Sequence, residues 1–468
     1  MYEPEISMEL PLGGSRATQP AQLRSGNSRI ATSYLDGLRG IAAILVYTYH
    51  YSMALEGKRL LSGYGPQNSS LISLPVIRLI RHSGPAMVSI FFAISGYVLS
   101  GGPLRHARWR QWDKLLVYLS GAALARPVRL LAPSILLTVA SLVLAWLGYY
   151  ERAAQGMCSP SSDASSVTSS SPQRCDFHPV TPPHLASLAA QIADWFGFVA
   201  RELANPWNWE AGLRPVSAYG LHLWTIGAEL RCSMVLFAVL AMLAPCPRPL
   251  GRAGLLLGLL AFCAIWGRWD MVAFLAGIGL AAGDANDNEI ETQQDDTGRL
   301  EGGQWQNANV PGIDAAGLMM TILRRITPSV SLFASLWLCS YPDSGGHEAW
   351  GFGILSSISS DRYLWHTTGG ILMLWAIRRI RPIRHFLSSF TAVQFLGRIS
   401  FSLYLVHEPL LQVWGWPLAR SWSGTPWPVT ALVFVIETCT LLCLASLMWL
   451  TVDQPVLHMV KVMRQYLS

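Results

Sequence analysis

The sequence predicts an all-α polytopic membrane protein, with about ten transmembrane helices packed in one bundle. Hydrophobic residues make up 51% of the 468 residues, whereas charged residues make up only 13%. Soluble domains carry about 25% charged residues, so this chain has too few to cover the surface of an ordinary cytosolic enzyme. The 19 Trp and 15 Tyr agree with this class, because their rings collect at membrane interfaces. The net charge of +6 is too small and too dispersed to suggest nucleic acid, so the expected partner is the lipid bilayer that the shortage of charged residues indicates.

The apolar segments define one membrane domain over 34–455, between polar cytosolic tails at 1–33 and 456–468. The N-terminal tail has no apolar signal-peptide core, so the first apolar helix is expected to be the membrane signal. The segments are, in chain order, 36–55, 85–101, 128–149, 219–245, 253–266, 269–283, 326–342, 368–380, 394–416 and 428–452. Several are shorter than the ~20 residues that span a bilayer. The pair 253–266 and 269–283 could therefore form one broken helix or a re-entrant hairpin.

Positive charge predicts the orientation, because Lys and Arg concentrate in short cytosolic loops. The loop 102–127 carries several Arg and Lys residues, and a second basic cluster occupies 378–393. Both fall on the cytosolic side when the N-terminus is cytosolic. The sequence therefore predicts a cytosolic N-terminus.

Two features are expected on the opposite, lumenal side. The loop 150–218 contains Cys158 and Cys175, which would be able to pair in an oxidising compartment. Asn68 opens an Asn-Ser-Ser sequon and is the predicted glycosylation site. The polar, acidic loop 284–314 falls on the cytosolic side, where a solvated linker is favoured over a regulatory segment.

The first apolar helix carries an Arg and a His on one face. Arg39 and His50 are eleven positions apart, which returns to nearly the same face about 16 Å further along a helix. His50 could move a proton near neutral pH, and Arg39 could hold a phosphate. A hydrogen-bonded interface histidine and a snorkelling positive-inside arginine are the structural alternatives.

Two later segments also place polar residues on one face. His222 and Glu229 are seven positions apart, as are Ser400 and His407, with Tyr404 one turn before His407. Ionisable groups at membrane depth usually face a bundle interior and mark a pathway or site. The alternatives are a structural Glu–Arg pair and hydrogen bonds between helices.

A third pair of basic residues lies where the segment 128–149 begins. Arg126 and Arg129 flank Pro127, a residue suited to a helix start. Both arginines could bind an anionic ligand. Positive-inside anchoring explains them equally well.

Together these segments resemble the acyltransferase 3 family of integral membrane acyltransferases, in a fungal type. The resemblance covers about residues 33–455, and the spacing from Arg39 to His50 is a hallmark of that family. The matching blocks are Ser33-Tyr-Leu-Asp36-Gly-Leu-Arg39-Gly, Phe91-Phe-Ala-Ile-Ser95-Gly96-Tyr97, Arg129-Leu130 with Pro133, His222-Leu-Trp224-Thr225-Ile226 with Glu229, Phe274-Leu-Ala-Gly277 and Gly397-Arg398-Ile-Ser400-Phe-Ser402-Leu-Tyr404-Leu-Val-His407-Glu-Pro409.

The resemblance implies transfer of an acyl group, often acetyl, from acyl-CoA to a hydroxyl, with essential roles for His50 and Arg39. Bacterial members often have paired acidic residues where this chain has Glu229-Leu-Arg231, and a fused hydrolase-like domain, which is not expected here. Fungal members often modify polyketides, terpenoids or alkaloids. A small lipophilic alcohol is therefore the expected acceptor, and an endomembrane such as the endoplasmic reticulum the expected location.

The residues and the resemblance give one mechanistic hypothesis. Arg39, Arg126 and Arg129 would hold coenzyme A, which is a cosubstrate rather than a bound cofactor, and no metal is expected. His50 would act as general base on the acceptor, and Glu229 would orient it.

Several assignments stay open at this point. His222, Tyr404 and His407 are the expected substrate-binding residues, and the oxyanion donor is left among Tyr47, Tyr51, Ser95 and His407. The alternative functions are a membrane transporter, an acyl-group translocator and the acylation of a sugar or glycan.

Overall fold

The computed structural model describes residues 21–66, 68–157, 180–208, 218–300 and 315–467, and within them the regular structure is helical, with only two isolated β-bridges. The α-helices are α1 (Ala21–Glu56), α2 (Lys58–Leu61), α3 (Gly84–Arg108), α4 (Trp112–Trp146), α5 (Tyr149–Met157), α6 (Leu188–Phe198), α7 (Trp224–Leu243), α8 (Pro249–Ile265), α9 (Trp269–Leu300), α10 (Ala315–Cys339), α11 (Gly353–Ile358), α12 (Arg362–Ile377), α13 (Arg381–Ser389), α14 (Thr391–Leu410), α15 (Trp416–Ser421), α16 (Trp427–Met448) and α17 (Gln454–Leu467). Shorter 3₁₀ and π segments are η1 (Leu71–Ser73), η2 (Ile77–Ile80), η3 (Val199–Leu203), η4 (Leu221–Leu223), η5 (Leu411–Gly415) and η6 (Trp449–Asp453).

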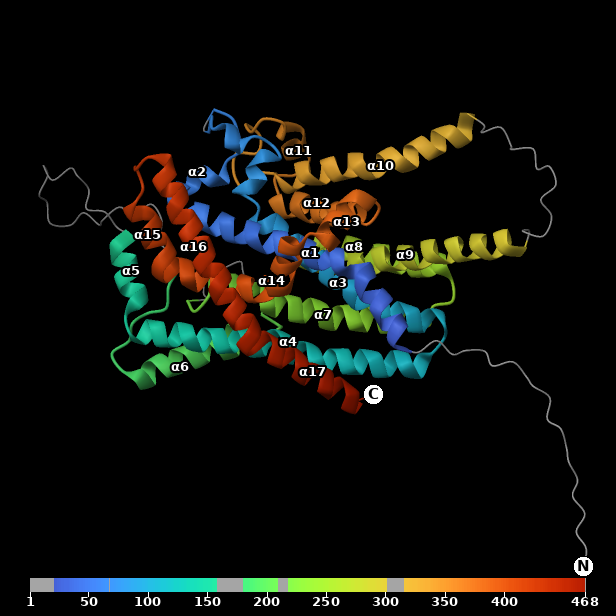
Figure 1. Cartoon of the computed structure of the whole chain (residues 1–468), viewed down its shortest axis with the longest axis horizontal. Helices are drawn as coiled ribbons and strands as arrows, with labels where there is room; N and C mark the ends of the chain where they lie inside the picture. Colours follow the sequence, from blue (N-terminus) through green and yellow to red (C-terminus); the bar gives the residue numbers. More distant parts are fainter. Residues whose placement is uncertain (1–20, 67, 158–179, 209–217, 301–314, 468) are drawn as a thin grey trace, which may run out of the picture.

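The long helices α4, α7, α9 and α10 run along the long axis of the molecule (Figure 1). Two helix pairs, α3 with α9 and α1 with α14, pack most extensively. Both crossings depend on glycine: a Cβ on Gly96 would lie 2.0 Å from the Phe274 carbonyl oxygen, and one on Gly397 would lie 2.4 Å from that of Asp36. Such close backbone approach is how helices associate in lipid, where burial of apolar side chains gives little driving force.

The predicted helical membrane class is confirmed, but ten spans are not. By length and composition, four helical stretches of the described residues could cross a membrane: Gly84–Arg108, Trp112–Trp146, Leu221–Leu243 and Trp427–Tyr466. A fifth results if Arg381–Ser389 and Thr391–Ser421, which meet at 72°, form one broken span. Pro249–Ile265 and Ile326–Cys339 are apolar but shorter. The uncertain pair at 253–283 is two helices, α8 and α9, which pack against each other.

Several helices extend beyond the apolar segments that predict them. α1 begins at Ala21, in the expected polar tail, and α4 begins at Trp112, within the basic loop. α9 continues to Leu300, so the acidic loop expected over 284–314 begins as helix, and 301–314 lie outside the described residues. Hydropathy marks the membrane-embedded part of a helix, whereas the backbone hydrogen bonds continue past it.

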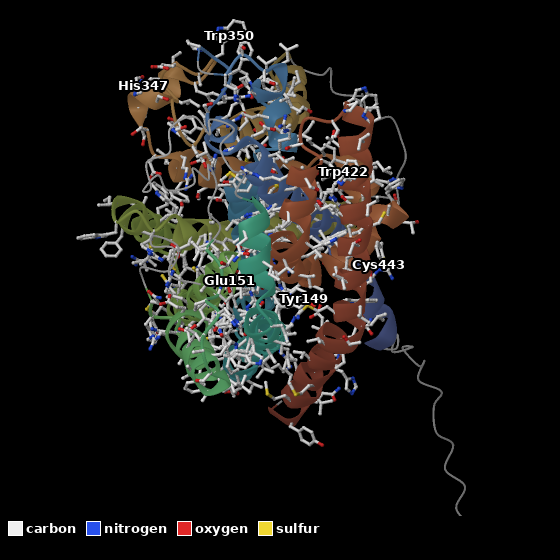
Figure 2. All side chains as sticks on the ribbon, turned by 90° about the vertical axis from the view of Figure 1, so that its left-hand side faces the viewer. Tyr149, Glu151, His347, Trp350, Trp422 and Cys443 are labelled. Carbon is white, nitrogen blue, oxygen red and sulfur yellow. The ribbon has the colours of Figure 1, made fainter. Side chains whose placement is uncertain are left out.

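The expected loop 150–218 is also partly helical, because it contains all but the first residue of α5 and all of α6 and η3. Cys158 and Cys175 lie outside the described residues, so their predicted pairing stays a prediction. Figure 2 views this end of the molecule, with Tyr149 and Glu151 of α5 in the foreground.

A polar cap, formed by residues 58–83 and 340–361, covers one end of the bundle. The Arg78 guanidinium is buried and donates hydrogen bonds to the carbonyls of Ser340 at 2.9 Å and Leu60 at 3.2 Å. His82 lies 3.5 Å from the Asp343 carboxylate, which also pairs with Arg362 at the start of α12. Trp350 and His347 mark the outer loop of this cap at the top of Figure 2. The cap therefore connects two distant chain segments to α12.

Candidate active site

Three histidines from distant segments meet inside the bundle. The His50 ring on α1 lies 5.2 Å from the His407 ring on α14, and the His222 ring on η4 lies 4.9 Å from His407, measured between ring centroids. In the part of the chain that the structure describes, no group of three or more His, Cys, Asp or Glu side chains is arranged to hold a metal ion. The close approach of three imidazole rings is suited to proton transfer and hydrogen bonding.

Glu408 fixes one end of this cluster. Its carboxylate forms an ion pair with the His222 ring, accepts the His222 backbone N–H at 2.8 Å and accepts the Gln412 amide at 3.0 Å. The second ring nitrogen of His222 lies 3.1 Å from the Leu405 carbonyl oxygen. Each ring nitrogen of His222 thus lies beside an oxygen atom, and neither is available to a ligand.

His407 lies in the middle of the cluster and has a different environment. It is fully buried, and its Nδ1 donates to the Tyr404 carbonyl at 2.6 Å. A neutral imidazole that donates through Nδ1 carries a lone pair on Nε2. The Nε2 atom is buried and has no hydrogen-bond partner among the described residues. His407 can therefore accept a proton or a hydrogen bond from a neighbour.

His50 is the histidine of the cluster that faces open space. Its side chain is half-buried and lines a cavity, and neither ring nitrogen hydrogen-bonds to a described residue. Its backbone carbonyl accepts a hydrogen bond of 3.0 Å from the Trp416 indole, and its ring lies edge-on to Tyr49. The helix is thus anchored at this turn, while the imidazole remains available to a ligand.

Two cavities approach the cluster from opposite ends of the bundle. The narrow cavity encloses about 450 Å³ and is lined by Arg39, Ser95, Glu229, Ser400 and Phe401, among others. The wide cavity encloses about 1660 Å³, contains His50 and His222, and extends to residues under the polar cap: Arg268, Trp269, Asp270, Arg362 and Tyr363. Both cavities share the side chains of Val88, Phe92, Thr225 and Tyr404.

Tyr404 belongs to the wall between the two cavities. Its hydroxyl lies 2.7 Å from the Thr225 hydroxyl and donates to the His222 carbonyl at 3.0 Å. The predicted substrate-binding residues His222, Tyr404 and His407 are thus brought together, with Tyr404 facing both cavities.

The arginines of the narrow cavity differ in their partners. Arg126 pairs with Glu229 and donates to the Ser233 hydroxyl at 3.0 Å, and Ser95 donates to the same carboxylate at 2.9 Å. Arg39 is close enough to Arg126 to interact electrostatically, but it makes no hydrogen bond or ion pair with a described residue. The Arg39 charge is therefore available to an anionic ligand.

Arg129 lies beside this group, but its charge is already balanced. It pairs with Asp453 of η6, and its guanidinium stacks 4.6 Å from the centroid of the Phe401 ring. Phe401 lines the narrow cavity, so Arg129 contributes to its wall through this ring. Arg231, which the helix spacing directs away from Glu229, indeed pairs with Asp270 at 2.8 Å.

The geometry corrects the expected role of Glu229. Its carboxylate serves Arg126 and Ser95, whereas the carboxylate nearest the histidine cluster is Glu408. The sequence contained a signal for Glu408, because an acidic residue follows His407 directly inside an apolar segment. Its partner on another helix could not be read from spacing.

The structure also narrows the candidates for the oxyanion donor. Tyr47 and Tyr51 pack against Phe434 of α16, and neither lines the narrow or the wide cavity. Ser95 lines the narrow cavity, although its hydroxyl already donates to Glu229. His407 lies next to His50, but its Nδ1 already donates to the Tyr404 carbonyl, and its Nε2 is an acceptor in this tautomer.

Asn68, the predicted glycosylation site, is enclosed by the polar cap. Its side chain is 5% exposed, and its amide nitrogen donates to the Arg59 carbonyl at 3.1 Å and the Ser73 hydroxyl at 2.9 Å. A glycan would replace one of these hydrogen bonds and would need space that the cap fills. This environment disfavours glycosylation of the folded protein.

A model of an acyltransferase domain family matches residues 32–446, which include all three histidines and both cavities. The O-acetyltransferase PaAT-1 of Phomopsis amygdali is 29% identical over 409 residues, covering 83% of this chain and 74% of that protein. The acyltransferase R4 of Phoma sp. is 26% identical over 428 residues, covering 84% of this chain and 85% of that protein. The acyltransferase clz18 of Cochliobolus lunatus is 24% identical over 447 residues, covering 85% and 86%. No solved structure matches the chain.

Proposed function

Because this chain is a membrane acyltransferase that belongs to the acyltransferase 3 family, we propose that it transfers an acyl group from acyl-CoA to a hydroxyl group of a small lipophilic acceptor. Acetyl is the proposed acyl group, because the relative PaAT-1 is named an O-acetyltransferase. The proposed acceptor is a secondary metabolite such as a polyketide or terpenoid, since these three relatives are fungal proteins.

The availability of His50 carries this proposal. It combines an imidazole without a hydrogen-bond partner among the described residues with a position in the wide cavity, close to the wall shared with the narrow one. A general base must reach the proton that it abstracts, and a free ring nitrogen at a cavity wall can do so. His222 is less suited, because both its ring nitrogens are occupied.

The proposed step conserves protons. His50 takes the proton of the acceptor hydroxyl as its oxygen attacks the thioester carbonyl carbon. The C–S bond then breaks, and the coenzyme A thiolate leaves and receives that proton from the imidazolium. The His407 ring lies beside His50, and the lone pair on its Nε2 can stabilise the protonated His50 ring.

The acyl donor is proposed to enter through the narrow cavity. Arg39 supplies a cation without an ion-pair partner in the described chain, and anions bind strongly to a guanidinium in a poorly hydrated site. A phosphate of coenzyme A held near Arg39 would direct the pantetheine arm toward His50, roughly 16 Å further along α1. This entry side is cytosolic in the proposed orientation, with the protein in an endomembrane.

The acceptor is proposed to occupy the wide cavity. Its space of about 1660 Å³, part of which is open to solvent, can hold a small polycyclic compound. Aromatic rings of Trp224, Trp269 and Tyr363 line it, and these suit a flat apolar skeleton.

The direct test is transfer from radiolabelled acetyl-CoA to a panel of hydroxylated metabolites, with the full-length protein in purified membranes. The variant His50→Ala should lose about 10²–10⁴-fold of the transfer rate at unchanged protein level. The matched control is His385→Ala, because His385 is an exposed histidine of α13 that lines neither cavity. Undiminished transfer by His50→Ala would show that His50 is not the base.

A further inference from the structure

A basic pocket lies at the end of the bundle opposite the polar cap, away from the histidine cluster. It encloses about 1220 Å³ between the end of α3, the start of α4 and the start of α8. Three arginines, Arg108, Arg110 and Arg252, line it together with Trp112, and none of its described lining residues is acidic. This arginine pocket shares no residue with the narrow or the wide cavity.

An apolar groove continues from the arginine pocket along the bundle. It encloses about 800 Å³ between α3, α7, α8 and α9, and its lining includes Leu240, Leu243, Leu256 and Ile278. The groove and the pocket share Leu104, Ala107, Ala244, Arg252 and Ala282, so the two form one continuous depression. A basic end followed by an apolar channel has the polarity of an anionic lipid.

The helix that borders the groove exposes a continuous apolar surface. None of the residues of α8 is buried, and Leu250 and Ile265 are 86% and 81% exposed. An apolar surface of this extent is unfavourable in water and suits contact with lipid tails. The groove behind α8 is therefore suited to an acyl chain.

The backbone adds to the positive potential of the pocket. α4 and α8 both begin beside it, at Trp112 and Pro249, and helix N-termini present unpaired N–H groups and a positive dipole end. The Arg252 Nε atom is buried and has no hydrogen-bond partner among the described residues. A buried donor without an acceptor is costly, which a bound phosphate would relieve.

We propose that the arginine pocket and the apolar groove together bind one anionic glycerophospholipid, with its phosphate at the arginines and an acyl chain in the groove. The proposal is independent of the acyl-transfer reaction, because the lipid touches none of the residues of the histidine cluster. Its role is to hold α8 against α3 and α7, since α8 otherwise packs mainly on α9.

Thermal unfolding of the full-length protein in neutral detergent tests this site. Mixed micelles that contain phosphatidylinositol should raise the unfolding temperature, whereas phosphatidylcholine should not. At phosphatidylinositol 100 times above its Kd, the folded-to-unfolded ratio should increase about 100-fold. The water-soluble glycerophosphoinositol, which lacks acyl chains, should give little of this shift.

Three variants locate the response. The double variant Arg108→Gln/Arg252→Gln should lose the phosphatidylinositol shift, and so should Ala253→Trp, which fills the groove and keeps the arginines. The control Arg105→Gln removes an exposed arginine of the same helix outside the pocket and should keep the shift. If the double variant does not fold, Ala253→Trp decides alone.

Three results would overturn the proposal. Equal stabilisation by phosphatidylinositol and phosphatidylcholine would show that the site does not recognise the anionic headgroup. A full shift with glycerophosphoinositol would show that no acyl chain binds in the groove. A raised KM for acetyl-CoA in the double variant, with the lipid response unchanged, would instead assign the arginine pocket to the nucleotide of coenzyme A.

Discussion

Replacing Glu408 by glutamine should destabilise the protein and slow acyl transfer, whereas the same replacement at Glu437 should do neither. Both glutamates are 1% exposed and lie in helices of the bundle. Glu408 pairs with the His222 ring and accepts two further hydrogen bonds. Both carboxylate oxygens of Glu437 are buried without a hydrogen-bond partner among the described residues. Comparing the two variants thus separates the effect of losing a partnered carboxylate from the effect of burial.

The magnitude follows from the partners. Glutamine keeps the shape of Glu408 but removes the carboxylate that pairs with the His222 ring, and its amide group would face another donor, from Gln412 or His222. Removing one partner of a buried ion pair costs about 3–5 kcal/mol of the free energy of unfolding. Glu437→Gln removes no interaction with the described residues and exchanges one unpaired polar group for another. Its effect should stay within about 1 kcal/mol.

Two measurements check this prediction. Thermal unfolding in detergent should show Glu408→Gln well below the wild type, with Glu437→Gln unchanged or slightly more stable. In the acetyl-CoA assay, Glu408→Gln should lose about 100-fold of the transfer rate, because a displacement of about 1 Å in the histidine cluster is enough for such a loss.

The reasoning fails if both variants unfold at the wild-type temperature. It also fails if Glu437→Gln is the more damaging of the two. A stable but inactive Glu408→Gln would retain the catalytic part of the argument and reject the energetic part.

Three further outcomes follow from other parts of the molecule. Arg39→Gln should raise the KM for acetyl-CoA by about 10- to 100-fold, with a smaller change in kcat, because it removes one charged hydrogen bond to the donor. An unchanged KM would show that the acyl donor binds elsewhere. Treatment with an N-glycosidase should leave the electrophoretic mobility unchanged, because the Asn68 side chain is enclosed; a shift that disappears in Asn68→Gln would contradict this. Burial alone would raise the pKa of Asp343, but His82 and Arg362 outweigh it and hold that pKa well below its usual range. This carboxylate therefore stabilises the fold above about pH 4, and that stabilisation is lost as the pH falls toward its folded pKa. Asp343→Asn should lower the unfolding temperature at pH 7, and the unfolding temperature of this variant should fall less steeply in acid than that of the wild type.

The fold class could be predicted because a lipid environment requires long apolar segments with few charged residues. Apolar segments had to be helical, since backbone groups in lipid must be satisfied within the segment, and each predicted segment lies on a helix. The extents of α1 and α4 were not readable, because polar residues continue these helices where water is again the solvent. The glycines of the family motifs marked helix crossings, but which helix each one meets needed the structure.

For the candidate site, the sequence indicates individual residues more readily than the contacts between them. Helix spacing placed Arg39 and His50 on one face, and the structure puts each in a cavity that reaches the shared wall. Spacing within one helix could not show that Glu408 would find His222, because the two come from segments 186 positions apart. Glu229 looked like the partner of a histidine because it was the deepest carboxylate on a face with His222.

The charge distribution of the narrow cavity explains why its arginines are not equivalent. Arg126 is neutralised by Glu229 and Arg129 by Asp453, so within the described residues these two ion pairs add no net charge to the site. Arg39 contributes a charge that is not balanced by an ion pair, and an anion that enters the cavity interacts with that charge at low local dielectric. Exchanging the carboxylates for amides would leave three competing cations and a less defined binding position. In the proposed donor route, the two pairs would therefore leave Arg39 as the partner of the anion, on the face of α1 that leads to His50.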